Sequence, residues 1–172
     1  NCEAEESPLP LPTLFGTLGH GLNSCHHTAA HPNKPRTNQR VPMTSSSVTL
    51  VQKCADALWA SDTATRSLGM QLTSVAPGTA AMSMVVRPDM TNGHGTCHGG
   101  FIFTLADSAF AFACNTYDER TVAQHAQITF IAPAKSGDRL IATAIERSRT
   151  GRSGIYDITV NLEDGQQIAE FR

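Results

Sequence analysis

The amino-acid sequence predicts an α+β domain in which a curved antiparallel sheet wraps around one long central helix. Two observations carry this prediction. Residues 101–115 contain neither proline nor glycine and are apolar nearly all round a helix, which is typical of a helix covered on almost every side. Runs of β-type residues flank this segment, and the turns between them are short enough to join antiparallel strands.

Before the central helix, the pattern predicts two more helices. Apolar residues spaced by three and four predict a helix over 47–60, and Asp62 can cap a second, short helix that Gly69 ends. A Pro77-Gly78 turn separates the first two strands. The predicted strands are, in chain order, 70–75, 80–86, 122–132, 139–147, 154–162 and 167–172, and we expect the last to end in mid-strand.

The composition excludes several function classes. The net charge is −2 and 16% of residues are charged, so no basic excess attracts a nucleic acid or an anionic membrane. No run of ~18 apolar residues could span a bilayer. The five cysteines are scattered and lack a C-x-x-C pair, which indicates reduced thiols in a cytoplasmic protein.

Residues 1–46 differ from the remainder. Six of the nine prolines fall here without any helical or strand period, so we expect a disordered or non-native leader before a domain at 47–172. Met43 is a candidate start of translation. Cys25 and the nearby histidines 26, 27 and 31 match no zinc-ligand spacing, and we expect no metal there.

One acidic residue breaks the apolar pattern of the central helix. Asp107 stands among Leu105, Ala106, Ala109 and Phe110, and burial disfavours a charged carboxylate that has no partner. It is either a structural carboxylate, exposed at an edge or satisfied by hydrogen bonds, or a catalytic base or nucleophile.

The helix is preceded by His98-Gly99-Gly100. The first N–H groups of a helix are unpaired and lie at the positive end of its dipole, and adjacent glycines let a ligand approach them. This arrangement suits a developing oxyanion, although an ordinary tight turn has the same sequence.

Asp107 and Gly99 are eight residues apart, which on one helix is about 12 Å along the axis. If both act on one carbonyl group, the carboxylate must come from a second subunit. The catalytic interpretation therefore predicts a two-fold dimer with antiparallel central helices and two shared sites.

A long motif over residues 92–115 reads NGHGTCHGGFIFTLADSAFAFACN, and it is supported by ITFIAPAKSGD at 128–138 and GIYDITV at 154–160. Over about 48–172 the chain resembles the hotdog-fold acyl-CoA thioesterases of the phenylacetic acid degradation (PaaI) type. The resemblance implies the hotdog fold and a homodimer, often paired into a homotetramer. It also implies an acyl-CoA substrate, of (hydroxy)phenylacetyl or related aryl or medium-chain type, with no cofactor besides the CoA of the substrate.

The same resemblance implies roles for four residues. Gly99 N–H would polarise the thioester carbonyl, and Asp107 would attack it or activate a water. Asn92 would position the carbonyl or the water, and His98 would support the loop by hydrogen bonds. Phe110 and Ala111 of the partner helix would line the acyl pocket.

The chain departs from this family at one position. Some relatives carry Ser or Thr in the strand after the helix to hold the water. Here the corresponding residue is Ala123, beside Gln124 and His125, so that role is unassigned.

Other interpretations remain open. His98 could be the base of a hydratase or dehydratase, or the domain could bind acyl-CoA without catalysis. Cys97 could be a nucleophile with His94 or His98 as its base. The same three residues could bind zinc, but a fourth ligand is missing.

Overall fold

The computed structural model describes the chain from residue 45 to residue 172, and side chains from residue 49 onward. The expected leader, except for its last two residues, lies outside the described residues, as does the cysteine–histidine group at 25–31. The helices are α1 (Ser45–Ser61), α2 (Thr63–Ser67), the short 3-10 helix η1 (Pro88–Met90) and α3 (Gly99–Cys114). The strands are β1 (Gln71–Ala76), β2 (Thr79–Val85), β3 (Ile128–Phe130), β4 (Arg139–Thr150), β5 (Ser153–Leu162) and β6 (Gln167–Phe171).

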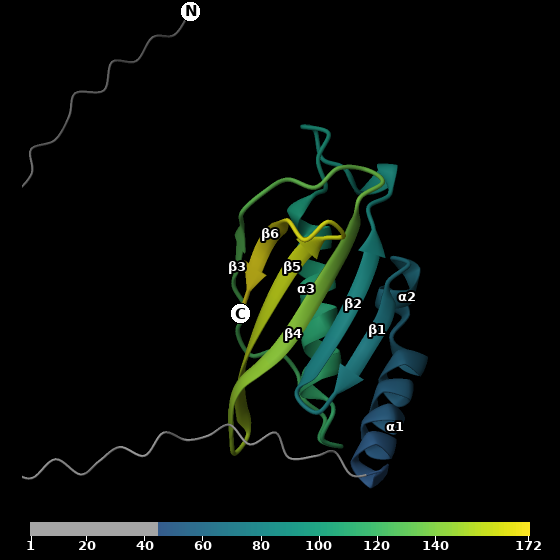
Figure 1. Ribbon diagram of the computed structural model, residues 1–172, viewed down its shortest axis with the longest axis vertical. Helices are drawn as coiled ribbons and strands as arrows, with labels where there is room; N and C mark the ends of the chain where they lie inside the picture. The colour runs from purple at the N-terminus through teal and green to yellow at the C-terminus, as the bar shows by residue number, and fades with distance from the viewer. Residues whose placement is uncertain (1–44) are drawn as a thin grey trace, which may run out of the picture. The chain divides into compact units, whose positions relative to one another are not determined.

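The six strands form one antiparallel sheet in the order β1-β2-β4-β5-β6-β3, and α3 lies across one face of it (Figure 1). The predicted α+β class and the sheet packed around a central helix are confirmed. Among the helices of residues 45–172, none combines the length and the apolar character that crossing a membrane requires.

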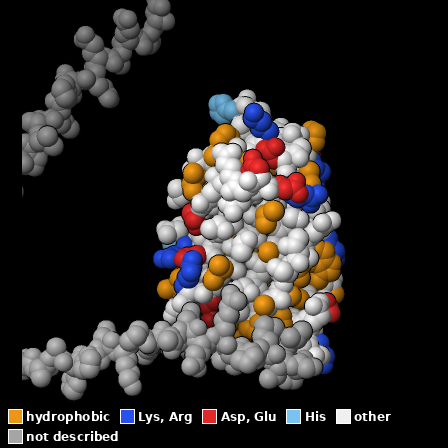
Figure 2. All heavy atoms as spheres, viewed as in Figure 1, with side chains coloured by type: hydrophobic (Ala, Val, Ile, Leu, Met, Phe, Trp, Pro, Cys, Tyr) orange, Lys and Arg blue, Asp and Glu red, His pale blue; other side chains and the backbone are white. Residues whose placement is uncertain are grey.

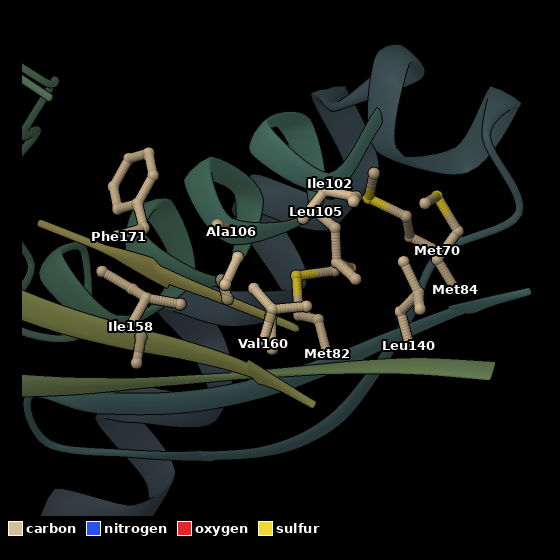
Figure 3. Packing of buried hydrophobic residues seen from close by; sticks show 14 of the residues in the cluster. Met70, Met82, Met84, Ile102, Leu105, Ala106, Leu140, Ile158, Val160 and Phe171 are labelled. Atoms are coloured by element: carbon tan, nitrogen blue, oxygen red, sulfur yellow. The ribbon is translucent and has the colours of Figure 1, made fainter. Parts of the chain in front are cut away.

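The core lies between α3 and the inner face of the sheet. Alternate residues of β2, β4 and β5 point toward the helix, as the two-residue period of a strand requires. Figure 3 shows these side chains packed around Ile102, Leu105 and Ala106 of α3. The buried strand residues include Met82, Met84, Leu140, Ala142, Ala144, Ile158 and Val160.

α2 lies where the sequence predicted it, between Asp62 and Gly69. Asp62 is its N-cap, and the carboxylate accepts a hydrogen bond from the backbone N–H of Thr65 at 3.0 Å. Gly69 follows with φ of +69°, a conformation that glycine adopts without strain. The hydroxyl of Thr65 lies 3.1 Å from that of Ser108, so a buried hydrogen bond joins α2 to the central helix.

The predicted strand over 122–132 is wrong in extent, because only Ile128–Phe130 is a strand. Gln127 still exchanges backbone hydrogen bonds with Arg172 at 2.9 Å. The preceding residues have no neighbouring strand among the described residues, so their β-type composition finds no ladder to join. They form an irregular segment, 121–126, at the sheet edge.

The prediction that the central helix is buried on nearly all sides is also wrong for the single chain. Its inner face is buried, but a stripe along the other side is only partly buried, although Phe103 and Phe110 within it contact Phe171 and Tyr156 of the sheet. We call this stripe the open face of α3; it comprises Phe103, Thr104, Asp107, Phe110 and Ala111. The helix also begins at Gly99, two residues earlier than predicted, because the side chain of His98 caps it.

Candidate active site

The loop before α3 is folded by Asn92. Its side-chain oxygen accepts hydrogen bonds from the backbone N–H groups of His94 (2.9 Å) and Thr96 (3.3 Å). Its amide nitrogen donates to the hydroxyl of Thr96 at 3.1 Å. Asn92 therefore fixes the shape of the loop that leads to the helix N-terminus.

His98 and Gly99 form that N-terminus. The backbone N–H of Gly100 donates to Nδ1 of His98 at 3.0 Å, so in the neutral ring the proton is on Nε2. The N–H of Gly99 donates to no acceptor within the described residues. One unpaired donor thus stands at the positive end of the α3 dipole.

Gly99 is also crowded by an aromatic ring. A Cβ atom at this position would lie 2.7 Å from Cζ of Phe130, closer than carbon atoms approach without displacement. A residue with a Cβ atom does not fit at this position unless Phe130 moves, because the Phe130 side chain of β3 covers it. Phe130 therefore lies directly beside the free N–H.

Asp107 projects from the open face of α3. It is half-buried, and within residues 49–172 no donor or cation lies within hydrogen-bond or ion-pair distance of its carboxylate. Burial raises the pKa of this carboxyl above its ordinary value. The alternative of a carboxylate satisfied within its own chain has no support in this geometry.

Within one chain, Gly99 and Asp107 are not brought together, because both belong to α3 with about 12 Å of helix between them. Asn92 and His98, by contrast, lie at the same end of α3 as Gly99. A single chain therefore holds two separate halves of the predicted site. One half is at the N-terminus of α3, and the other is at Asp107 in the middle of the helix.

The structure gives no support for Cys97 as a nucleophile or for a zinc site at His94, Cys97 and His98. Burial raises the pKa of the Cys97 thiol to about 11, so very little reactive thiolate exists near neutral pH. Within the described residues, no group of three or more histidine, cysteine or acidic side chains is arranged to hold a metal ion. His94, Cys97 and His98 are thus not among the described side chains arranged to hold a metal ion.

A cavity of about 310 Å³ lies beside Phe110, the residue expected to line an acyl pocket, and most of its other lining residues were not predicted. It is lined by Phe110, the 121–126 segment, the start of β5 and the end of β6. The rings of Phe110 and Tyr156 meet edge to face in its wall, with centroids 5.3 Å apart. Ala123, Gln124 and His125 line the cavity, whereas Ala111 does not.

The chain is similar in sequence to known proteins. The thioesterase superfamily matches residues 94–169. The chain is 40% identical over 118 residues to acyl-coenzyme A thioesterase PaaI of Escherichia coli (strain K12), covering 69% of this chain and 84% of that protein. It is 36% identical over 112 residues to human acyl-coenzyme A thioesterase 13, covering 62% and 79%.

Solved structures give the same result. The structure of the E. coli PaaI protein from the phenylacetic acid degradation operon superposes with a TM-score of 0.71 at 38% identity, covering 72% of this chain and 90% of that one. A Streptococcus mutans UA159 protein bound to acetyl CoA superposes with a TM-score of 0.56 at 25% identity, covering 59% and 82%.

Proposed function

This chain belongs to the thioesterase superfamily and has its hotdog fold, and on that basis we propose that it is an acyl-CoA thioesterase that releases a free acid and CoA. The observation that carries the proposal is the unpartnered, half-buried carboxylate of Asp107 on a helix whose first N–H is free. Thioester hydrolysis needs both a base or nucleophile and an oxyanion donor.

The reaction follows from these two groups. The thioester carbonyl oxygen accepts a hydrogen bond from Gly99 N–H, which polarises the carbonyl carbon. Asp107 of the partner subunit takes a proton from a water as that water attacks the carbon. The negative charge on oxygen is stabilised by the helix N-terminus, the C–S bond breaks, and the CoA thiolate takes up the proton.

In a second version of this route, Asp107 attacks the carbon directly and water then hydrolyses the mixed anhydride. The raised pKa of Asp107 favours the first version, because a base is most effective when its pKa approaches the working pH. His98 and Asn92 are positioning residues. His98 accepts the hydrogen bond of the Gly100 N–H and leaves the Gly99 N–H free, and Asn92 fixes the loop.

The shared site requires a dimer, and two surfaces support one. The open face of α3 is only partly buried, and the neighbouring sheet edge exposes Val122 (81% exposed), Phe130 and Ile131. In a dimer with its two-fold axis beside α3, the partner chain covers both surfaces. Each Asp107 then lies near the N-terminus of the partner's α3.

Pairing of dimers into a homotetramer has its own candidate surface. Val85, Ile145 and Ile155 alternate with inward residues and are exposed on the outer face of the sheet. Figure 2 shows this face, where few charged side chains lie near the middle.

The substrate class we propose is an aryl or medium-chain acyl-CoA, such as (hydroxy)phenylacetyl-CoA, hydrolysed in the cytoplasm without a separate cofactor. The relative that is 40% identical is named an acyl-coenzyme A thioesterase, and the cavity beside Asp107 has two aromatic rings in its wall. Edge-to-face rings suit an aromatic acyl group.

The direct test incubates the protein with phenylacetyl-CoA and follows free thiol. Asp107→Ala should abolish release while the dimer stays folded, and Asp56→Ala, which removes an exposed carboxylate of α1, should leave the rate unchanged. Turnover by Asp107→Ala would remove Asp107 from the mechanism. Binding without thiol release would favour the non-catalytic alternative, and conversion of a 2-enoyl-CoA without thiol release would favour the hydratase.

A mixing experiment tests the shared site. Gly99→Ala and Asp107→Ala chains are each inactive alone, but a heterodimer has one site with both groups intact. Random exchange of equal amounts should recover about a quarter of the wild-type rate, because half of the dimers are mixed and each has one working site. No recovery in proven heterodimers would place both groups of a site in one chain.

A further inference from the structure

The cavity beside Phe110 differs in charge from two other hollows of the described surface. Arg152, Arg172 and His125 stand at its rim, and none of its lining residues is acidic. A hollow beside α1 and one beside β3 and β6 each include two carboxylates. The aromatic cavity thus has no carboxylate in its lining to repel an anion, whereas the other two each have two carboxylates and one arginine.

Arg152 is free to bind such an anion. It lies in the turn between β4 and β5, is exposed, and has no carboxylate of residues 49–172 within ion-pair distance. The neighbouring arginines are engaged: Arg149 pairs with Glu119 at 2.6 Å, and Arg172 pairs with Asp157 at 2.6 Å. Arg152 is therefore the guanidinium at this rim without a partner in its own chain.

The cavity also adjoins the proposed base. Phe110 follows Asp107 by three residues on the open face of α3, so the two side chains lie about one helical turn apart. A thioester whose carbonyl is held at Asp107 can place its acyl group against the ring of Phe110 and extend its CoA portion to Arg152 at the rim.

We infer that Arg152 binds the phosphate groups of the CoA portion of the substrate, while the apolar part of the same molecule lies in the cavity. This inference rests on the proposed acyl-CoA substrate and names the residue that recognises its nucleotide end. A guanidinium forms paired hydrogen bonds with phosphate oxygens. A phosphate stays partly hydrated at an exposed rim, whereas a carboxylate on the buried acyl end would need a buried cation, and Arg152 is exposed.

The experiment measures calorimetric affinities for CoA and for pantetheine, which lacks the nucleotide. Arg152→Gln removes the charge, and Arg152→Lys keeps it without the paired geometry. Arg139→Gln is the matched control, because it removes an arginine charge roughly 36 Å away at the other end of β4.

We expect Arg152→Gln to weaken CoA binding about five- to tenfold and to leave pantetheine binding unchanged. Arg152→Lys should retain most of the affinity, and Arg139→Gln all of it. The difference between wild type and Arg152→Gln should shrink in high salt, because the contact is exposed.

Three results would overturn the inference: equal CoA affinity of Arg152→Gln and wild type, an equal loss for CoA and pantetheine, or the same loss in Arg139→Gln. A loss confined to thioesters with a carboxylate on the acyl group would instead assign Arg152 to that end. The proposed function is separable, because thiol release is measured independently. Arg152-dependent CoA binding without thiol release contradicts only the function, and thiol release with Arg152-independent binding contradicts only the inference.

Discussion

The substitution Gly99→Ala should affect two measured quantities very differently: the free energy of unfolding and the rate of thiol release. The new Cβ atom would lie 2.7 Å from Cζ of Phe130 and 3.1 and 3.2 Å from its two Cε atoms. The ring must therefore move. It is 51% exposed at the sheet edge of the single chain, so it can turn away from α3 without displacing the core of its own chain.

The cost to stability is bounded. Full exposure of a half-buried phenylalanine removes roughly 100 Å² of apolar contact, or about 2.5 kcal/mol at 25 cal/mol per Å². Alanine gains up to about 1 kcal/mol over glycine in a helix. We expect urea unfolding of Gly99→Ala to show a loss of about 1.5 kcal/mol.

The expected loss of activity is much larger. Cβ bonds in a helix tilt toward its N-terminus, so the added methyl group stands beside the N–H that the thioester oxygen must reach. Removing one oxyanion donor lowers turnover by about 10²- to 10³-fold. Thiol release should fall by that factor, while Gly93→Ala in the same loop, where a Cβ meets no atom within 4 Å, should change neither rate nor stability.

The double variant with Phe130→Ala decides between two causes. Removing the ring relieves the clash, so the two stability losses should not add. The activity should stay low, because the methyl group still covers the N–H. If the double variant regained the rate of Phe130→Ala alone, the loss would come from the displaced ring, and the donor role of Gly99 would be refuted.

Three more predictions concern single groups. In Asp107→Asn, thiol release is lost. The pKa of Asp107 is raised in the folded state, so the free energy of unfolding of wild type should fall relative to this variant as pH rises from about 3 through the raised pKa. The difference should then level off, and urea unfolding at several pH values measures it. Cys97, with a pKa of about 11, should resist iodoacetamide at about pH 8 in the folded protein, and Cys97→Ala should keep thiol release; mass mapping and the thiol assay check both. Thr65→Val breaks the bonds to Asp62 and Ser108 and should lower the free energy of unfolding by about 1–3 kcal/mol in urea, and an unchanged midpoint would show that this buried link contributes nothing.

Features set by local chemistry were predictable from the sequence. The capping carboxylate of Asp62 and the left-handed Gly69 bound α2 where expected, because a cap and a positive φ depend on a few neighbouring residues. The apolar run at 101–115 likewise identified the central helix. Asp107 was recognisable because a carboxylate within such a run conflicts with its surroundings.

Features that depend on distant segments were not predictable. Residues 122–126 have strand composition but no neighbouring strand to pair with among the described residues. The cavity joins parts of α3, β5, β6 and the 121–126 segment, so its walls become visible only when the sheet order is known. Arg152 has no sequence pattern of its own, and its distinction is that its neighbours are paired.

The two unsatisfied groups of α3 are complementary, and this links the fold to the proposed assembly. A free N–H at the positive end of the helix and an unpaired carboxylate about 12 Å along it cannot meet within one chain. In a two-fold interface each contact occurs twice, so placing Asp107 near the partner's Gly99 satisfies both groups on both chains. The interface would also cover the apolar residues of the open face. The same burial that raises the pKa of Asp107 would then increase on association, and the dimer would hold the base and the donor on opposite sides of one thioester carbonyl.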